Sequence, residues 1–379
     1  MKKTAKLKIM SVFGTRPEAI KMCPLVKELQ KYPQIESLVC LTGQHRQMLD
    51  QVTDIFNVKA DYDLNIMRPS QTLTSITSDI LVGMEGVLKD AAPDMVLVHG
   101  DTSTSFAVAL AAFYQQIPVG HVEAGLRTFN PYSPFPEEMN RCLTGRLASM
   151  HFAPTILNEK NLLREGITKN VFVTGNTVID AFQTTVRSDY SFKAPDLARI
   201  DLSSRRTILL TAHRRENLGG PLENICRAIL RLVKDFPDVQ VIYPVHMNPS
   251  IRSTVNAILG GADKVHLIEP IDVEDMHNLI SRSYLVMTDS GGLQEEAPSC
   301  GIPVLVLRHE TERPEAVEAG TVKVVGVDED NIYDEAVALL TDREKYDAMA
   351  HAVNPYGDGH ACQRIAKHLL DYFKAEEQK

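Results

Sequence analysis

Several common catalytic and cofactor motifs are missing from the sequence. The six cysteines include no Cys-x-x-Cys pair and the twelve histidines form no His-Glu-x-x-His motif, so zinc ribbons, dithiol redox sites and zinc proteases are not indicated. The Walker A motif, a Gly-x-Gly-x-x-Gly fingerprint after the first strand and a Gly-x-Ser-x-Gly elbow are also absent. ATP and nicotinamide chemistry are therefore poorly supported, and we expect neither a cofactor nor a metal ion.

Long apolar runs and an excess of positive charge are missing as well. No stretch reaches the roughly 20 apolar residues that span a bilayer, and the formal net charge of -9 at pH 7 disfavours non-specific binding to nucleic acid. The apolar run at residues 7–13 contains Lys8 and has no small-residue cleavage site, so it predicts a first strand rather than a signal peptide. We expect a cytoplasmic globular protein with reduced cysteines, no membrane insertion and no nucleic-acid partner.

Apolar runs and amphipathic stretches alternate along the first half of the chain. The amphipathic stretches include residues 18–31, 72–89 and 102–115. The short apolar runs lie at residues 8–13, 37–41, 95–99, 118–122 and 171–174. This alternation of strand and helix patterns predicts a parallel sheet with helices on both faces.

The same alternation restarts after a polar stretch at residues 188–206. Six further apolar runs follow, at residues 207–211, 239–245, 265–268, 284–288, 303–307 and 322–327. A chain of 379 residues is long enough for two domains of ordinary size. We therefore predict two doubly wound α/β domains, residues 1–175 and 176–358, with a junction near 176–206. A last helix at about 359–379 is expected to pack back on the first domain.

Polar residues follow the predicted strands of the first half, where doubly wound sheets bind their ligands. Thr15 and Glu18 follow the first strand with the spacing of a helix capping box. Such a helix start attracts anions, and Arg16 beside it and Lys21 one turn on add positive charge. The alternative is a well-capped helix that carries two solvated cations.

Three carboxylates lie at the corresponding ends of later strands or at a helix start. Asp101 ends an apolar strand and precedes a helix, where it also fits the ordinary role of an N-cap. Glu123 ends the next strand, and Glu137 lies four residues before Arg141, so that this pair shares a helix face. The pair is either a simple helix ion pair or a carboxylate held at a cleft by an arginine. Crowded carboxylates raise one another's pKa, which suits acid–base chemistry near neutral pH.

The second half offers two such loops. His213 and the arginines at 214–215 follow its first strand, either as site residues or as a solvated charge run. Residues 290–292 (Ser-Gly-Gly) follow its fourth strand and open a helix, so that backbone N–H groups can approach a diphosphate. Glu296, about one and a half turns further, can accept hydrogen bonds from ribose hydroxyls. The alternative is a glycine turn that serves packing alone.

These loops belong to longer motifs that resemble those of the non-hydrolysing UDP-N-acetylglucosamine 2-epimerases. The motifs follow one another in order along essentially the whole chain: residues 14–19 (GTRPEA), 42–45 (TGQH), 98–102 (VHGDT), 121–127 (HVEAGLR), 136–141 (PEEMNR), 211–217 (TAHRREN) and 289–296 (DSGGLQEE). The resemblance implies two Rossmann-like domains in the glycosyltransferase-B arrangement, an active site in the cleft between them, and a homodimer.

The resemblance also implies a reaction and its residues. In this family, anti elimination of UDP from UDP-N-acetylglucosamine gives 2-acetamidoglucal, and UDP adds back with a proton on the opposite face of carbon 2. The product, UDP-N-acetylmannosamine, supplies cell-envelope polysaccharide. Carried over by position, the catalytic residues are Asp101, Glu123, Glu137 and His213, the last assisting departure of the diphosphate. The residues implied to bind substrate or UDP are Arg16, Lys21, Arg141, Ser290, Gly291, Gly292, Glu296 and Arg313.

Bacterial members of the family can require UDP-N-acetylglucosamine at a second, allosteric site. The positions that match this site are Gln44, His45, Gln47, Arg214 and His246. One position departs from the family pattern, because Ser70 stands where an arginine is expected, and Arg68 lies two residues away.

Three other functions stay open on the sequence alone. A sugar transferase of the same fold would need an acceptor groove, and the three carboxylates argue against it. A hydrolysing epimerase would use the same elimination and release UDP and free N-acetylmannosamine. The chain carries no fused kinase domain, from which we expect the non-hydrolysing form. A silent nucleotide-sugar sensor would keep the loop at residues 290–296 and could dispense with the carboxylates.

Overall fold

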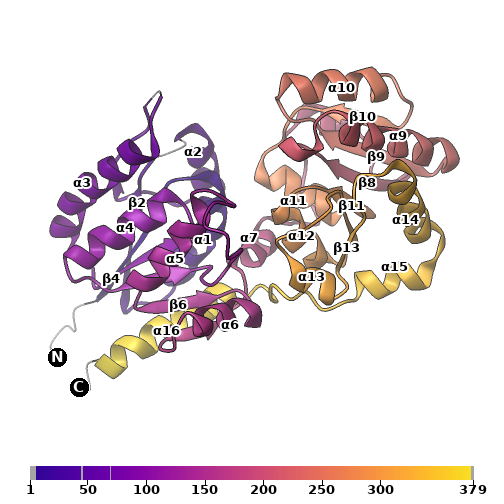
Figure 1. The fold of residues 1–379 in the computed structure, drawn as a ribbon. Helices are drawn as coiled ribbons and strands as arrows, with labels where there is room; N and C mark the ends of the chain where they lie inside the picture. The colour runs from indigo at the N-terminus through magenta and orange to yellow at the C-terminus, as the bar shows by residue number, and fades with distance from the viewer. Residues whose placement is uncertain (1–5, 44–45, 69, 377–379) are drawn as a thin grey trace. The chain divides into compact units, whose positions relative to one another are not determined.

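The computed structural model describes residues 6–43, 46–68 and 70–376, with only the backbone of residues 46–48. The chain divides into two compact units, of which unit 1 is Met1–Thr184 with Tyr356–Lys379 and unit 2 is Thr185–Pro355. Each unit is one parallel sheet with helices on its two faces (Figure 1). The predicted fold class, two Rossmann-like doubly wound units, is therefore confirmed.

The sheet of unit 1 has the strand order β3-β2-β1-β4-β5-β6-β7. The strands are β1 (Leu7–Phe13), β2 (Ile35–Leu41), β3 (Tyr62–Asp63), β4 (Met95–His99), β5 (Val119–Val122), β6 (Met150–Ala153) and β7 (Val171–Val173). Alternate residues of β1 enter different apolar clusters, Ile9 and Phe13 on one face and Met10 and Val12 on the other. Both faces of the sheet are thus buried, as is usual for parallel sheets.

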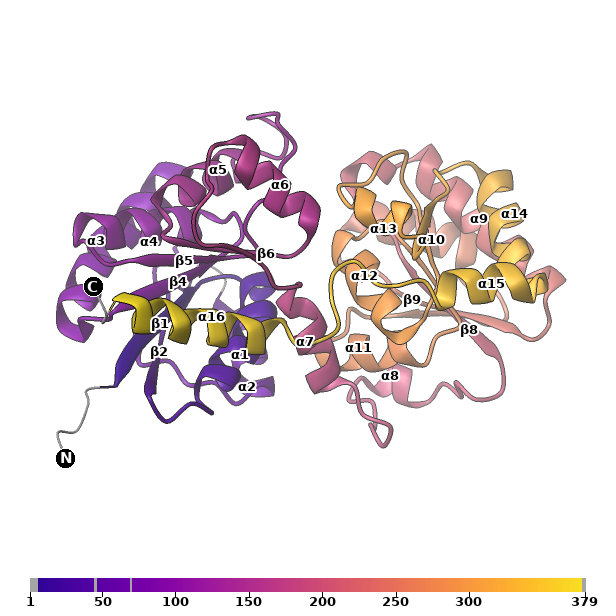
Figure 2. The ribbon, with the colours of Figure 1, turned by 90° about the horizontal axis from the view of Figure 1, so that it is seen from below.

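The helices of unit 1 cover both faces of its sheet (Figure 2). One face carries α1 (Arg16–Leu29), α2 (Arg46–Ile55) and α16 (Ala361–Glu376), and the other carries α3 (Leu73–Ala91) and α4 (Ser103–Tyr114). The unit also contains α5 (Glu137–Leu147) and α6 (Ile156–Arg164), and α7 (Thr177–Thr185) leads out of it. Helix α16 packs against α1 and buries Cys362, Ile365 and Leu369 in the same apolar cluster.

The sheet of unit 2 has the strand order β10-β9-β8-β11-β12-β13. The strands are β8 (Arg206–Thr211), β9 (Val239–Pro244), β10 (Val265–Ile268), β11 (Leu285–Thr288), β12 (Val304–Val306) and β13 (Val322–Val324). The helices are α8 (Pro195–Ala198), η1 (Arg215–Asn217), α9 (Gly220–Asp235), α10 (Pro249–Leu259), α11 (Val273–Ser281), α12 (Gly291–Glu296), η2 (Ala297–Cys300), α13 (Pro314–Glu318), α14 (Glu329–Thr341) and α15 (Arg343–Ala350). All six strands predicted for this half are confirmed.

Two strands of unit 1 were not predicted from the sequence. Strand β3 has only two residues, and β6 has the four residues Met-His-Phe-Ala, in which His151 interrupts the apolar run although it is buried. The other five strands begin and end within two residues of the predicted runs. Among the described residues, no helix is long and apolar enough to cross a bilayer.

Candidate functional site

The predicted site residues of unit 1 follow strands that meet at one edge of its sheet. Strands β1 and β4 are neighbours at the point where the strand order reverses, which is where doubly wound sheets bind ligands. Strand β5 pairs with β4 on the other side, with His99 opposite Val122. The residues that come next in the chain, Asp101 and Glu123, therefore leave the sheet at the same edge as Arg16, the first residue of α1.

The turn between β1 and α1 is the predicted capping box. Thr15 accepts from the Glu18 N–H at 3.5 Å, and Glu18 Oε2 accepts from the Thr15 N–H at 2.8 Å and the Gly14 N–H at 3.0 Å. The other oxygen of Glu18 accepts from Thr102 Oγ1 at 2.6 Å, which links this turn to the loop after β4. Burial raises the pKa of Glu18 despite these bonds. Helix α1 is thus well capped, as the alternative interpretation of this segment expected. The Arg16 side chain is half-buried at the start of the helix.

Glu123 is held in an unusual backbone conformation by a set of polar neighbours. Its φ is +60°, a value that non-glycine residues rarely adopt. Lys21 Nζ forms an ion pair with Oε1, and Asn176 Nδ2 donates to the same oxygen at 3.0 Å. His99 Nε2 lies 3.4 Å from Oε2. Outliers of this kind cluster at functional sites, where surrounding contacts stabilise them.

Asp101 does not cap helix α4. The N-cap is Thr102, whose side chain accepts from the Ser105 N–H at 3.1 Å, so the N-cap alternative for Asp101 is wrong. The Asp101 carboxylate instead forms an ion pair with Arg141, and the Asp101 carbonyl accepts from Asn140 Nδ2 at 2.9 Å. The Asp101 carboxylate is therefore not used as a helix cap, and two residues of α5 fix the position of Asp101.

The expected pairing of Glu137 with Arg141 is corrected by the structure. Arg141 bonds Glu138, one residue further along, at 3.1 Å between Nη1 and Oε2, and it also bonds Asp101. Within the described residues, no ion pair joins Glu137 to Arg141, because a spacing of three brings Glu138 round to the buried face of α5. Glu137 is half-buried in the first turn of that helix. The expectation that crowded carboxylates raise one another's pKa stays a prediction.

Unit 2 repeats the arrangement at its own point of strand reversal, between β8 and β11. Asp289 follows β11, is fully buried, and through Oδ2 accepts from the backbone N–H of His213 at 2.7 Å and of Arg214 at 2.8 Å. Its Oδ1 lies 3.1 Å from His213 Nδ1. Burial alone would raise the pKa of Asp289, but His213 and these N–H groups lower it below its usual value. Asp289 is therefore a buried anion that lies beside the imidazole of His213.

The loop after β11 leaves several polar groups at the start of α12. The Ser290 side chain makes no capping bond to this helix. Neither Gly291 nor Gly292 has a positive φ, so glycine serves close approach here rather than backbone conformation. A Cβ on Gly291 would lie 3.9 Å from Arg313 Nη2, and one on Gly292 would lie 3.4 Å from Glu296 Oε1. The loop thus combines N–H groups, a hydroxyl, a cation and a carboxylate.

Two of these side chains, Arg313 and Glu296, each contact a buried polar side chain. Arg313 forms an ion pair with Glu295, and His277 Nε2 lies 3.5 Å from Glu296 Oε2. His277 is in turn bonded through Nδ1 to Thr185 Oγ1 at 2.6 Å. Unit 2 therefore brings together the predicted residues at 213, 290–292, 296 and 313 from the segments that follow β8, β11 and β12.

The predicted allosteric residues are described only in part. Gln44 and His45 lie outside the described residues, and Gln47 belongs to α2 without a described side chain. The His246 ring stacks on the His213 ring, with 5.7 Å between centroids and 14° between planes. Arg214, the residue after His213, donates from Nε to the Asp289 carbonyl at 2.8 Å.

Sequence reasoning missed the residues that hold the site together. Asn176, His99 and Asp289 each lie at the end of a parallel strand or just beyond it, the same signal that identified Asp101 and Glu123. Glu138 was missed because the carboxylate four residues before Arg141 was preferred to the carboxylate three residues before it. Among residues 6–43, 46–68 and 70–376, no group of three or more histidine, cysteine or acidic side chains is arranged to hold a metal ion.

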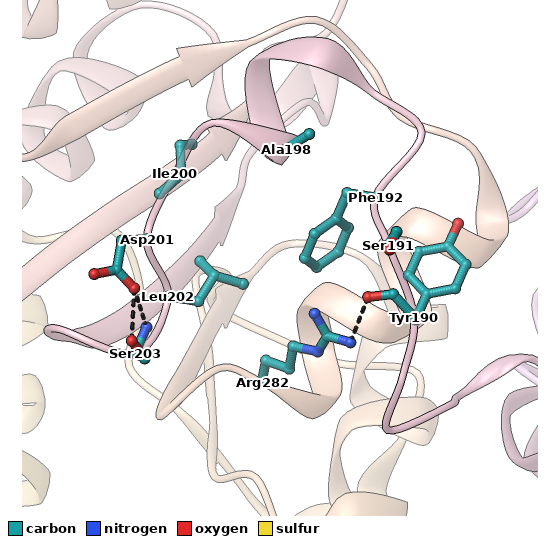
Figure 3. Close-up of a pocket in the computed structure, with 9 residues that line it drawn as sticks. All are labelled: Tyr190, Ser191, Phe192, Ala198, Ile200, Asp201, Leu202, Ser203 and Arg282. Carbon is teal, nitrogen blue, oxygen red and sulfur yellow. Dashed lines mark hydrogen bonds between the residues drawn. The ribbon is translucent and has the colours of Figure 1, made fainter.

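A separate surface pocket of about 550 Å³ lies in unit 2, away from these loops in the chain (Figure 3). Phe192 lies over the Arg282 guanidinium at 4.9 Å, and Arg282 Nη2 donates to the Tyr190 carbonyl at 2.8 Å. The pocket is lined by Tyr190, Ser191, Phe192, Ala198, Ile200, Asp201, Leu202, Ser203 and Arg282, none of which is a predicted site residue.

Comparison with known proteins identifies what the chain is similar to. A family model described as UDP-N-acetylglucosamine 2-epimerase matches residues 27–370. The UDP-N-acetylglucosamine 2-epimerase of Bacillus subtilis is 60% identical over 369 residues, which cover 97% of this chain and 96% of the relative. The match thus extends over both units.

Solved structures give the same result. A crystal structure of a UDP-N-acetylglucosamine 2-epimerase is 57% identical, with a TM-score of 0.90, and the match covers 98% of this chain and 97% of the other. The Neisseria meningitidis enzyme, solved bound to UDP-GlcNAc, is 51% identical with a TM-score of 0.86, over 96% of this chain and all of the other. Both matches cover nearly the whole of this chain.

Proposed function

The chain belongs to the UDP-N-acetylglucosamine 2-epimerase family, and from that premise we propose that it interconverts UDP-N-acetylglucosamine and UDP-N-acetylmannosamine. The family's enzymes are isomerases. The observation that carries the proposal for this chain is the pair of carboxylates at one sheet edge, Glu123 beside Lys21 and Asp101 beside Arg141. A cation next to a carboxylate favours its ionised form, which can accept a proton.

The proposed reaction proceeds by elimination because the proton on carbon 2 is weakly acidic. A base removes that proton, its bonding electrons form the C1=C2 double bond, and the C1–O bond breaks to release UDP. The products are 2-acetamidoglucal, UDP and a protonated carboxyl group. In the return step the diphosphate oxygen bonds C1 again, and an acid delivers a proton to the opposite face of carbon 2. No oxidant, reductant or water is consumed.

Unit 1 would supply the acid–base groups. Asp101, Glu123 and Glu137 are the proposed proton donors and acceptors, with Lys21 and Arg141 as the cations that hold two of them. General acid–base groups of this kind contribute about 10²–10⁴-fold to a rate. Arg16, at the first turn of α1, is proposed to contact the diphosphate.

Unit 2 would bind UDP and stabilise it as a leaving group. The backbone N–H groups of Gly291 and Gly292, the Ser290 hydroxyl and the Arg313 guanidinium are proposed diphosphate contacts, and Glu296 is the proposed ribose contact. His213, oriented by Asp289, assists departure of the diphosphate. Donors aimed at charge that develops in a transition state contribute roughly 2.7–4 kcal/mol each in known cases.

Solvent exchange followed by NMR tests the proposed reaction. The protein is incubated with UDP-N-acetylglucosamine in deuterium oxide, and deuterium at carbon 2 together with a stable mixture of two UDP-sugars is expected. Net release of UDP and free N-acetylmannosamine would identify the hydrolysing reaction instead, and absence of exchange would leave a binding protein.

Variants assign the carboxylates in the same assay. Asp101→Asn and Glu123→Gln are each expected to abolish turnover while unfolding cooperatively at a temperature close to that of the unchanged protein. Glu223→Gln, at an exposed helix ion pair with Arg227, is the matched control and should retain full activity. Turnover at the unchanged rate in either site variant would remove that residue from the mechanism.

A second site for UDP-N-acetylglucosamine, formed by Gln44, His45, Gln47, Arg214 and His246, is also part of the proposal. The stacking of His246 on His213 supports it, because a ligand on His246 would act directly on a catalytic ring. We expect turnover to depend sigmoidally on substrate concentration and to become hyperbolic in His246→Ala. A hyperbolic curve for the unchanged protein would contradict this site.

Self-association as a homodimer is proposed on the basis of an exposed apolar face. Val82 on α3 is 72% exposed, and Phe113 and Tyr114 on α4 are 57% and 70% exposed. Helices α3 and α4 pack against each other, so these side chains lie on adjoining elements (Figure 1). Sedimentation should show a dimer that Tyr114→Glu dissociates and that Val353→Glu, at an exposed valine of unit 2, leaves intact.

The proposed setting is the cytoplasm, with the product used for cell-envelope polysaccharide. Support comes from the six cysteines, all of which are free thiols in the structure, as expected for a reducing compartment.

A further inference from the structure

Two buried polar side chains that the proposed mechanism does not use lie against Glu123. Asn176 and His99 are 3% and 4% exposed, respectively. They come from different strand ends, since His99 is the last residue of β4 and Asn176 lies just beyond β7. Burying polar groups is unfavourable unless they are bonded, so their placement around one carboxylate calls for an explanation.

Asn176 is fixed in one amide orientation. Its Oδ1 accepts from the Val178 N–H at 3.1 Å, so its Nδ2 is the group that faces Glu123 Oε1 at 3.0 Å. Its own backbone N–H donates to the Tyr356 carbonyl at 2.7 Å. The backbone beside it is also closely packed, because a Cβ on Gly175 would lie 3.3 Å from that carbonyl. The amide therefore has little freedom to follow a moving carboxylate.

His99 approaches the other oxygen of the same carboxylate. Its Nε2 is buried and lies 3.4 Å from Glu123 Oε2, but it makes no hydrogen bond within the described part of the chain. Burial lowers the pKa of His99 to about 4, so the ring is neutral at neutral pH. The next residue, Gly100, has a φ of +64°, and a Cβ there would lie 3.3 Å from the same Oε2. The backbone at this position thus leaves room for the carboxylate.

We propose that Asn176 and His99 are positioning residues for Glu123, which fix the plane of its carboxylate and thereby the direction in which it exchanges a proton with carbon 2. Lys21 supplies charge, the Asn176 amide bonds one oxygen of the carboxylate, and the neutral His99 ring packs against the other oxygen. A general base acts only within hydrogen-bond reach and alignment of the proton it removes, so a rotated carboxylate loses rate without losing substrate affinity. This inference rests on the proposed acid–base role of Glu123.

The sharpest test replaces Asn176 by aspartate, which has the same shape but repels Glu123. In Asn176→Asp, kcat is expected to fall at least about tenfold while KM changes by less than about threefold, because the group acts on proton transfer. The acid limb of the kcat–pH profile should move to higher pH, since a second anion favours protonated Glu123. Lys21, His99, His121 and Asp101 are titratable groups that interact in this cluster, so the same profile is recorded for Lys21→Met to separate the contribution of the lysine.

A pair of His99 variants gives independent measurements if the aspartate variant does not fold. His99→Gln keeps a polar side chain beside Oε2 and should retain most of the rate, whereas His99→Leu should lose at least about tenfold in kcat. Asn278→Ala removes a buried amide of unit 2 that bonds backbone groups of Thr185, Glu274 and Arg187, and it controls for loss of stability. Its kcat–pH profile should match that of the unchanged protein.

The outcomes separate the inference from the proposed function. If the unchanged protein exchanges carbon 2 deuterium but the Asn176 and His99 variants keep its kcat and pH profile, the positioning role is wrong and the reaction stands. If the variants lose only thermal stability, the two residues are structural and the inference is overturned. If the unchanged protein shows no exchange, the proposed function itself fails.

Discussion

At the scale of single residues, the site depends on buried carboxylates that accept hydrogen bonds from the backbone N–H groups of neighbouring loops. Asp289 accepts through Oδ2 from two backbone N–H groups and from Asn217 Nδ2 at 3.0 Å, while its carbonyl accepts from Arg214. Because its folded pKa is below the unfolded value, its contribution to stability is present above the unfolded pKa of about 3.8 and is lost as the pH falls through the folded value. Asp289 is thus ionised wherever the protein is expected to work.

Asp289→Asn is expected to lower both stability and activity. The amide retains one acceptor but places an N–H group against donors, which costs about 1–3 kcal/mol for an unsatisfied buried group. His213 loses its anionic partner, so kcat should fall by about 10–100-fold. Urea unfolding and steady-state kinetics measure the two effects. Asp263→Asn, at an exposed aspartate, should change neither quantity, and an active, stable Asp289→Asn protein would contradict the orienting role.

At the scale of elements, Glu138 ties the loop before α5 to Asp101. The carboxylate is 2% exposed, accepts from the Thr128 N–H at 3.0 Å and the Phe129 N–H at 2.9 Å, and pairs with Arg141. Arg141 in turn holds Asp101. The loop at Thr128 and Phe129 is therefore connected to Asp101 through the side chains of Glu138 and Arg141.

Glu138→Gln is expected to reduce kcat at least about tenfold with the fold retained, because a neutral amide no longer holds Arg141 on Asp101. The measurement is the deuterium exchange rate at carbon 2 together with the thermal unfolding temperature. An exchange rate within twofold of the unchanged protein would show that Arg141 holds Asp101 without help from Glu138.

Helix α16 is expected to be necessary for unit 1. Leu369 is fully buried in the cluster beneath β1, and Leu370 beside it is half-buried, so the two form a matched pair on one helix. Leu369→Ala should lower the free energy of unfolding by about 2–5 kcal/mol, and Leu370→Ala by clearly less. Equal losses in denaturant unfolding would contradict the packing of α16 on the sheet.

Much of this could be predicted from the sequence because strand runs and the polar residues after them are local patterns. Asp101, Glu123 and Ser290 were identified in this way, and the capping box at Thr15 was identified by its spacing. The partner of Arg141 and the neighbours of Glu123 were not, because they depend on which loops meet in space. Asn176 and Glu123 are 53 residues apart, and no periodicity in the sequence joins them.

At the scale of the whole molecule, three buried histidines make stability depend on pH. Burial lowers the pKa of His99 to about 4, of His121 to about 3 and of His151 to about 4, and all three lie in neighbouring strands of unit 1. The unfolded chain, with histidine pKa values near 6.5, binds more protons than the folded chain below that pH. The stability contributed by these neutral rings is complete above about pH 6.5 and is lost as the pH falls toward 4.

The free energy of unfolding is therefore expected to decrease between pH 6.5 and 4.5, by about 1.4 kcal/mol per pH unit for each histidine that stays neutral in the fold. His121→Gln removes one such group, so its stability should fall less steeply over the same range. Urea unfolding at several pH values measures both slopes. Parallel curves for the two proteins would mean that His121 takes up its proton in the folded state.

The division of the chain has a consequence for how it is made. Unit 2 occupies one continuous segment, whereas unit 1 is completed by residues that follow it, including Ile365 and Leu369 of α16. On the ribosome, every residue of unit 2 emerges before α16 does. The half proposed to bind the nucleotide can therefore finish folding during translation, whereas the half with the proposed acid–base groups keeps part of its apolar surface uncovered until α16 has been synthesised.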